Sequence, residues 1–82
     1  MNRAPTRHVG EMSVMDGTGH STLTWTADDP DRIAAAREAF DNLIRKGYSA
    51  FGSKAKADAK HALDRFDPTM EELVMVPRTV GG

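Results

Sequence analysis

The chain has 82 residues, of which 39% are hydrophobic and 28% are charged, a balance typical of one small globular domain with a thin core. Its 11 lysines and arginines against 12 acidic residues give a net charge of -1, so no overall positive field favours nucleic acid or an anionic membrane as a partner. Cysteine is absent, which excludes disulfides, thiolate metal sites and a cysteine nucleophile, and fits a cytoplasmic protein.

Residues 1–10 carry Pro5 and three basic or titratable side chains without apolar periodicity. We interpret them as a flexible N-terminal arm, with a basic anchor as the alternative. The longest uninterrupted apolar runs in the chain are four residues long, so we expect neither a membrane span nor a signal peptide.

The first strand is predicted at residues 11–16, where Met12 and Val14 alternate with their neighbours and would face the core. The Asp16-Gly17 pair that follows is typical of a tight hairpin turn. A phosphate-binding loop at Gly17 and Gly19 is disfavoured, because such a loop leads into a helix and a strand pattern follows here.

The second strand is predicted at residues 21–26, which show the strictest period-two pattern in the chain. Leu23 and Trp25 would point into the core while three threonines point to solvent. We interpret Trp25 as a core residue rather than as a binding hot spot.

A helix is predicted at residues 30–46. Asp29 would cap it, Pro30 suits its first position, and Gly47 would end it. Its apolar stripe consists of Ile33, Ala36, Phe40, Leu43 and Ile44. The neighbouring aspartates lack the spacing of a calcium loop, so capping explains them and no metal site is expected.

A third strand is predicted at residues 48–51, between Gly47 and Gly52. Residues 54–66 allow either a helix or a loop with a short strand at 62–66. We favour the loop and strand, because Leu63 and Phe66 are the only large apolar residues there.

Neither the lysines nor the histidines of the chain predict a binding site. Lys54, Lys56 and Lys60 form the densest positive cluster, which we interpret as a solvated loop rather than as an anion or partner contact. The histidines stand singly, without the spacing of zinc ligands.

The last strand is predicted at residues 73–76, a continuous apolar run that indicates a central strand covered on both faces. Pro77 would end it. Residues 77–82 would then form a flexible tail that ends in Gly81 and Gly82.

Together these elements predict an α+β fold, with one helix across one face of a mixed sheet of four to five strands. Their order and the ending resemble the ubiquitin-like β-grasp proteins: an apolar strand, Arg78 four residues before the end, and a diglycine. The tail departs from ubiquitin at Pro77 and Val80, where ubiquitin has leucine and a second arginine. The resemblance assigns residues 11–76 to a ubiquitin-like domain.

This resemblance implies a non-enzymatic protein without a cofactor. Prokaryotic ubiquitin-like modifiers and small sulfur carriers share such an ending, which an adenylating enzyme activates with ATP. Gly81 and Gly82 would be the conjugation terminus, and Arg78 and Val80 would contact the activating enzyme. A conjugating enzyme, an isopeptidase and a target protein would be further partners.

Three functional hypotheses follow. The first is a protein modifier, which we favour, and the second is a sulfur carrier that uses the same tail. The third is a small structural or binding domain, for example a phage-virion or accessory protein that presents a sheet face or edge to a partner.

Overall fold

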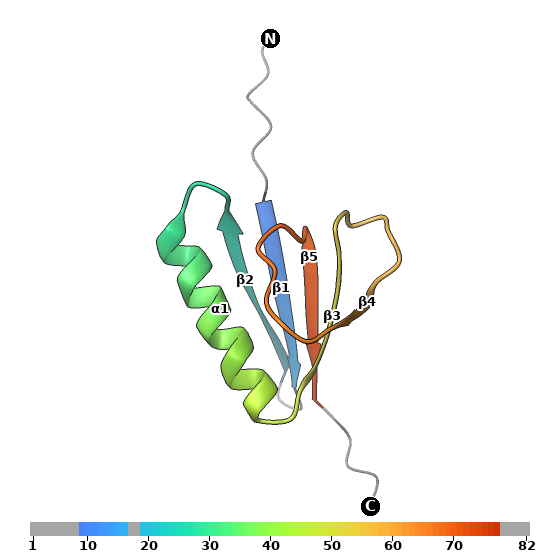
Figure 1. Cartoon of the computed structure of the whole chain (residues 1–82). Coiled ribbons are helices and arrows are strands. Elements are labelled where there is room, and N and C mark those ends of the chain that lie inside the picture. The colour runs from blue at the N-terminus through green and yellow to red at the C-terminus, as the bar shows by residue number, and fades with distance from the viewer. Residues whose placement is uncertain (1–8, 17–18, 78–82) are drawn as a thin grey trace, which may run out of the picture.

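A computed structural model describes residues 9–16 and 19–77 of the chain (Figure 1). The elements are β1 (Val9–Asp16), β2 (Gly19–Thr26), α1 (Pro30–Arg45), β3 (Ser49–Ser53), β4 (His61–Leu63) and β5 (Glu72–Val76). Within the described residues the strands form one 5-stranded sheet, with α1 packed on one of its faces. The prediction of an α+β domain with a mixed sheet and one helix is confirmed.

The strand order in the sheet is β2-β1-β5-β3-β4. The first and last strands of the described chain, β1 and β5, lie side by side in parallel, and Glu11 is level with Glu72. All other neighbouring strands are antiparallel. The parallel pair therefore joins two antiparallel ribbons, β2-β1 and β5-β3-β4, into one sheet.

Local signals explain where α1 begins and ends. The side chain of Asp29 accepts a hydrogen bond of 3.1 Å from the amide of Arg32, and Pro30 occupies the first turn. Lys46 caps the other end, and Gly47 follows with φ of 98°, a left-handed conformation that favours glycine. The predicted helix is confirmed to within one residue.

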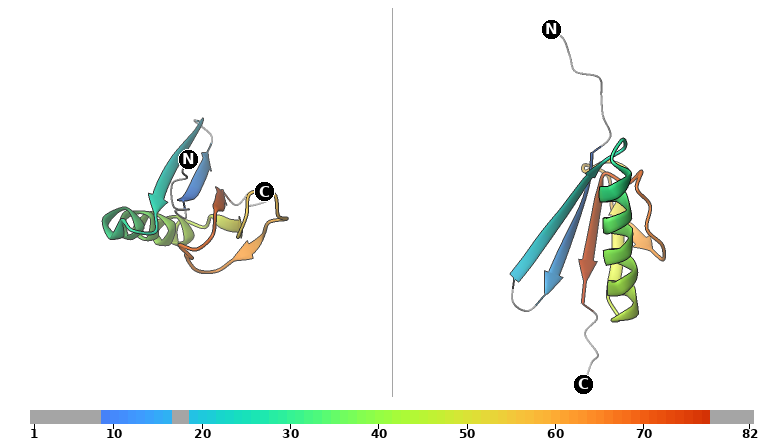
Figure 2. Two further views of the ribbon diagram at one scale, coloured as in Figure 1. Left: turned by 90° about the horizontal axis from the view of Figure 1, so that it is seen from above. Right: turned by 90° about the vertical axis from the view of Figure 1, so that its left-hand side faces the viewer.

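The core lies between α1 and the sheet, as the two views of Figure 2 show. Trp25 is 1% exposed and donates a hydrogen bond of 3.0 Å from Nε1 to the carbonyl of Pro68. Its ring packs edge-on against Phe66, with 5.2 Å between centroids, and Phe66 packs in the same way against Phe40. The remaining buried apolar residues are Met12, Val14, Ala36, Ala50, Met70, Leu73 and Met75.

Two burial predictions were wrong. Leu23 shares the helix-facing side of the sheet with Trp25, but it is 37% exposed. It lies on the edge strand β2, where the sheet extends beyond the helix. β5 is central, as expected, but its burial alternates, because α1 covers a single face: Leu73 and Met75 are buried, while Val76 is 36% exposed.

Strand boundaries also differ from the expected ones, and β2, for example, begins at Gly19 rather than at residue 21. β1 begins at Val9 rather than at residue 11, so Gly10 belongs to the sheet and pairs with Trp25. β3 continues through Gly52, where a Cβ would come within 2.5 Å of the Leu73 side chain. The preferred loop and strand in residues 54–66 are confirmed, but β4 spans only His61–Leu63.

Candidate interaction surface

The predicted tail residues Arg78, Val80, Gly81 and Gly82 lie outside the described residues. The structure shows where the strand that leads to them ends. Val76 is the last residue of β5 and pairs with Ser49 of β3. The described chain thus leaves the sheet from its central strand, beside the end of the β1-β2 hairpin (Figure 1).

The sheet face opposite α1 carries a group of exposed apolar side chains. Phe51 lies directly opposite Val74 across β3 and β5, and Val76 is two residues further along the same face. Met15 follows Val14 just as Val76 follows Met75, and because Val14 and Met75 are level, Met15 and Val76 are neighbours on this face. We call Met15, Phe51, Val74 and Val76 the open-face patch.

Exposure within the open-face patch is high for apolar residues of this size. Met15 is 40% exposed, Phe51 is 37% exposed and Val74 is half-buried. Scattered exposed apolar residues are normal on a protein surface, whereas neighbouring ones form a candidate contact surface. The open-face patch consists of methionine, phenylalanine and valine side chains, so it holds no titratable or nucleophilic group.

At the other end of the same face, two acidic residues form ion pairs with two lysines. Glu11 and Glu72 lie level on β1 and β5. Lys56 Nζ lies 3.1 Å from Glu11 Oε1, and Lys60 Nζ lies 2.7 Å from Glu72 Oε1. Two ion pairs therefore connect the loop between β3 and β4 to strands β1 and β5.

The same loop makes two further polar contacts. The backbone amide of Lys56 donates to Glu71 Oε1 at 2.8 Å, and Lys54 Nζ donates to Thr69 Oγ1 at 2.7 Å. The hydrogen bond and charge of Glu11 raise the pKa of the Lys56 ammonium above its ordinary value. Lys56 and Lys60 are thus paired with carboxylates, whereas Lys54 contacts only the neutral hydroxyl of Thr69 and keeps its positive charge.

Sequence reasoning missed these contacts because their acidic partners are far away along the chain. Glu11 lies in the first strand, Glu72 begins the last strand, and Glu71 immediately precedes it. The sequence does show an acidic pair, Glu71 and Glu72, just before an apolar strand. Which lysines contact this pair, however, depends on the order of the strands in the sheet. Without that order, a solvated loop is the natural interpretation.

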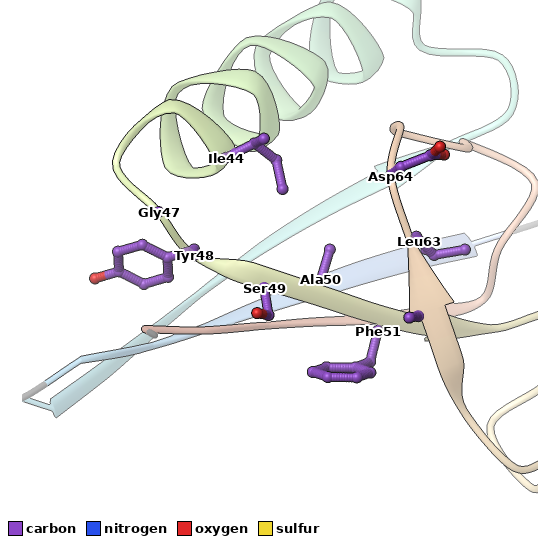
Figure 3. Close-up of a pocket in the computed structure, with 9 residues that line it drawn as sticks. Ile44, Gly47, Tyr48, Ser49, Ala50, Phe51, Leu63 and Asp64 are labelled. Carbon is purple, nitrogen blue, oxygen red and sulfur yellow. The ribbon is translucent and has the colours of Figure 1, made fainter. Parts of the chain in front are cut away.

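A cavity of about 330 Å³ opens between the end of α1 and strands β3 and β4 (Figure 3). Ile44 from the helix and Ala50 from the sheet point into it, whereas Phe51 points to the opposite face. Asp64 lies at its border with its side chain 95% exposed. Asp64 is the only carboxylate among the residues that line the cavity, so the cavity offers no paired acid and base.

Two further features, a metal-ligand group and a membrane-spanning helix, are absent from the part of the chain that the structure describes. Residues 9–16 and 19–77 contain no group of three or more histidine, cysteine, aspartate or glutamate side chains placed to hold a metal ion. In the same ranges no helix combines the length and the apolar character that crossing a bilayer requires. The open-face patch is the group of exposed apolar side chains that the strand register brings together.

Comparisons of this chain with protein-family models, with characterised proteins and with solved structures gave no match.

Proposed function

We propose that this chain is a ubiquitin-like β-grasp protein that acts as a protein modifier. One observation carries the proposal: the central strand β5, parallel to β1, leads directly into a segment with Arg78 and a diglycine. A mixed five-stranded sheet with one helix across one face is compatible with the fold that the resemblance to ubiquitin-like proteins implies.

The proposed chemistry takes place at the carboxylate of Gly82. That carboxylate attacks the α-phosphate of ATP in the active site of an adenylating enzyme, which releases pyrophosphate and forms an acyl-adenylate. A thiol of the enzyme then displaces AMP, and a lysine amine of the target displaces the thiol to form an isopeptide bond. The modifier supplies the electrophile, while its partners supply the catalytic groups.

Glycine suits this role because a narrow active site admits a backbone without side chains. Arg78 and Val80 would contact the activating enzyme. An isopeptidase would reverse the linkage, and the need for ATP would place the protein in the cytoplasm. The proposal requires that Gly82 bears the free carboxylate, which the intact mass of the protein from its native host measures.

A second candidate function, a non-enzymatic binding domain, is favoured by the open-face patch. Met15, Phe51 and Val76 are each at least 36% exposed on one face of the sheet, where a partner protein could cover them. A sulfur carrier is the third alternative. It shares the adenylation step, but its acyl group receives a sulfur atom instead of a lysine amine.

The test is to incubate the protein with ATP and the adenylating enzymes encoded near its gene, and to follow it by intact mass spectrometry. A modifier gives an adduct to a lysine of another protein, and a sulfur carrier gives a thiocarboxylate. Deletion of Gly82 should abolish either product, whereas Thr79→Ala, which keeps the diglycine, should leave it in place. Absence of both products with the full-length protein would refute activation and favour the binding domain.

A further inference from the structure

The two edges of the sheet in the described residues differ in how they are protected. Natural edge strands avoid pairing with other chains through short length, charged residues, proline or bulges. β4 has 3 residues and is flanked by Lys60 and Asp64. β2, at the opposite edge, has 8 residues from Gly19 to Thr26 and contains no lysine, arginine, aspartate, glutamate or proline. The β4 edge is therefore protected against pairing with another strand, whereas the β2 edge is not.

The unprotected edge is also accessible. Every residue of β2 from Gly19 to Thr24 is exposed. β2 pairs with β1 one residue to one, without a bulge, so its backbone is regular enough to accept another strand. In the right view of Figure 2, β2 forms the outer border of the sheet, and its start lies away from α1 whereas its end leads to the helix.

The outward backbone amides and carbonyls of β2 can form hydrogen bonds with a further strand. In an antiparallel ladder, alternate residues direct both their amide and their carbonyl away from the neighbouring strand. The Thr26 carbonyl is one outward group, because it accepts a hydrogen bond of 3.1 Å from the amide of Asp29 in the following turn. By alternation, His20, Thr22 and Thr24 present the remaining outward groups, at a stretch where the side chains are exposed.

We propose that β2 pairs with β2 of a second copy of this chain, antiparallel about a two-fold axis at Thr22. In this register Thr22 faces its own equivalent, His20 faces Thr24 of the other copy, and Ser21 faces Leu23. All these pairs are free of like charges, and threonine pairs are favourable across antiparallel strands. The two sheets then form one continuous sheet.

The exposure of Leu23 favours a second copy of this chain as the partner that pairs with β2. It is 37% exposed on the helix-facing side, beyond the cover of α1. In the symmetric pair, the two Leu23 side chains lie on the same side of the joined sheet, diagonally across the axis, and cover each other. A strongly charged peptide would gain no ion pair on this edge, because β2 carries no acidic or basic side chain other than His20.

The size of the contact sets the expected affinity. A pairing over about five residues buries far less surface than the roughly 1,600 Å² of a standard stable interface. We therefore expect a reversible dimer with a Kd of about 0.1 mM, in the range of weak transient contacts. This inference rests on the edge strand alone and does not depend on the proposed modifier function.

The test compares two lysine variants by sedimentation velocity between about 10 µM and 1 mM, a range that brackets the expected weak contact. Thr22→Lys places two ammonium groups opposite each other at the two-fold axis, and should weaken the dimer by about tenfold or more. Ala62→Lys introduces the same charge at the exposed position of the protected edge strand β4, and should leave the dimer unchanged.

Amide spectra of the unchanged protein give a readout that needs no variant. The amides of His20, Thr22 and Thr24 should shift with concentration and exchange more slowly with solvent as the dimer forms, while those of Phe51 and Val74 should not. A monomer at 1 mM would overturn the proposal. So would a dimer that Thr22→Lys leaves intact, or concentration-dependent shifts confined to the open-face patch, since both place the contact elsewhere.

Discussion

Substitution of Gly10 by alanine should destabilise the fold far more than its place near the start of β1 suggests. Gly10 pairs with Trp25 across the β1-β2 ladder, and the indole lies directly over it. A Cβ at Gly10 would lie 2.2 Å from Trp25 Cε2 and 2.4 Å from Nε1, well inside van der Waals contact. The indole must therefore move before alanine can be accommodated.

The cost follows from what the indole would lose. Its hydrogen bond to Pro68, 3.0 Å long, is worth about 1 kcal/mol, and the edge-on contact with Phe66 adds about 1 kcal/mol. Overpacking strain contributes about 1–3 kcal/mol. Against this, alanine gains about 0.5–1 kcal/mol over glycine through lower entropy of the unfolded chain. The net loss is about 3 kcal/mol, a large share of the roughly 4–12 kcal/mol expected for a domain of this size.

Urea unfolding followed by fluorescence is a direct assay, because Trp25 is the only tryptophan in the chain. We expect Gly10→Ala to lower the midpoint strongly and to reduce Tm by about 15 °C. Trp25→Phe offers a control, because its smaller ring leaves room for a methyl group. The double variant, measured by circular dichroism, should be less destabilised than the sum of the two single changes. Additive effects, or a Gly10→Ala protein as stable as the unchanged one, would refute the proposed packing.

Three further predictions concern the loop, the helix and the open face. Glu11→Gln should lower the pKa of Lys56, measured by NMR titration of its side chain, and an unaltered pKa would contradict the contact. In the unchanged protein, the stabilisation from this ion pair is fully present below the ordinary lysine pKa of 10.5. It is lost as the pH rises through the higher pKa of the folded state. Asp29→Ala should cost about 1 kcal/mol in urea unfolding, whereas Asp29→Asn keeps the capping acceptor and should cost less; equal losses would contradict the cap. Phe51→Ala should cost far less than Phe40→Ala, which we expect to cost about 3–5 kcal/mol because Phe40 is fully buried; similar costs would mean that the open face is covered.

The helix and the turns could be predicted from sequence because their signals are local. Asp29, Pro30 and Gly47 lie within one turn of the helix ends that they define. The expected strands were found for the same reason, since alternation is visible over a few residues. Their boundaries shifted where a glycine in the strand reflects packing rather than a turn, as at Gly10 and Gly52.

The contacts between distant segments could not be predicted. Phe66 lies outside every strand, yet it joins Trp25 to Phe40, because the connection from β4 to β5 passes over the core. The pairing of Lys56 with Glu11 likewise requires that β1 lie beside β5. The open-face patch also depends on this order, since a continuous apolar run in β5 gives no sign that one face stays uncovered. The predicted tail residues lie outside the described ranges, so their roles stay predictions.

The parallel pairing of β1 with β5 has a consequence for synthesis of the protein. β1 is made first, but the strand that covers its second edge emerges after β2, α1, β3 and β4. Until then a nascent chain can form the β1-β2 hairpin and α1, while Met12 and Val14 lack Leu73 and Met75 beside them. Such long-range closure slows folding and leaves an apolar strand edge open to other chains. We therefore expect premature termination before residue 72 to yield aggregating fragments rather than a smaller folded domain.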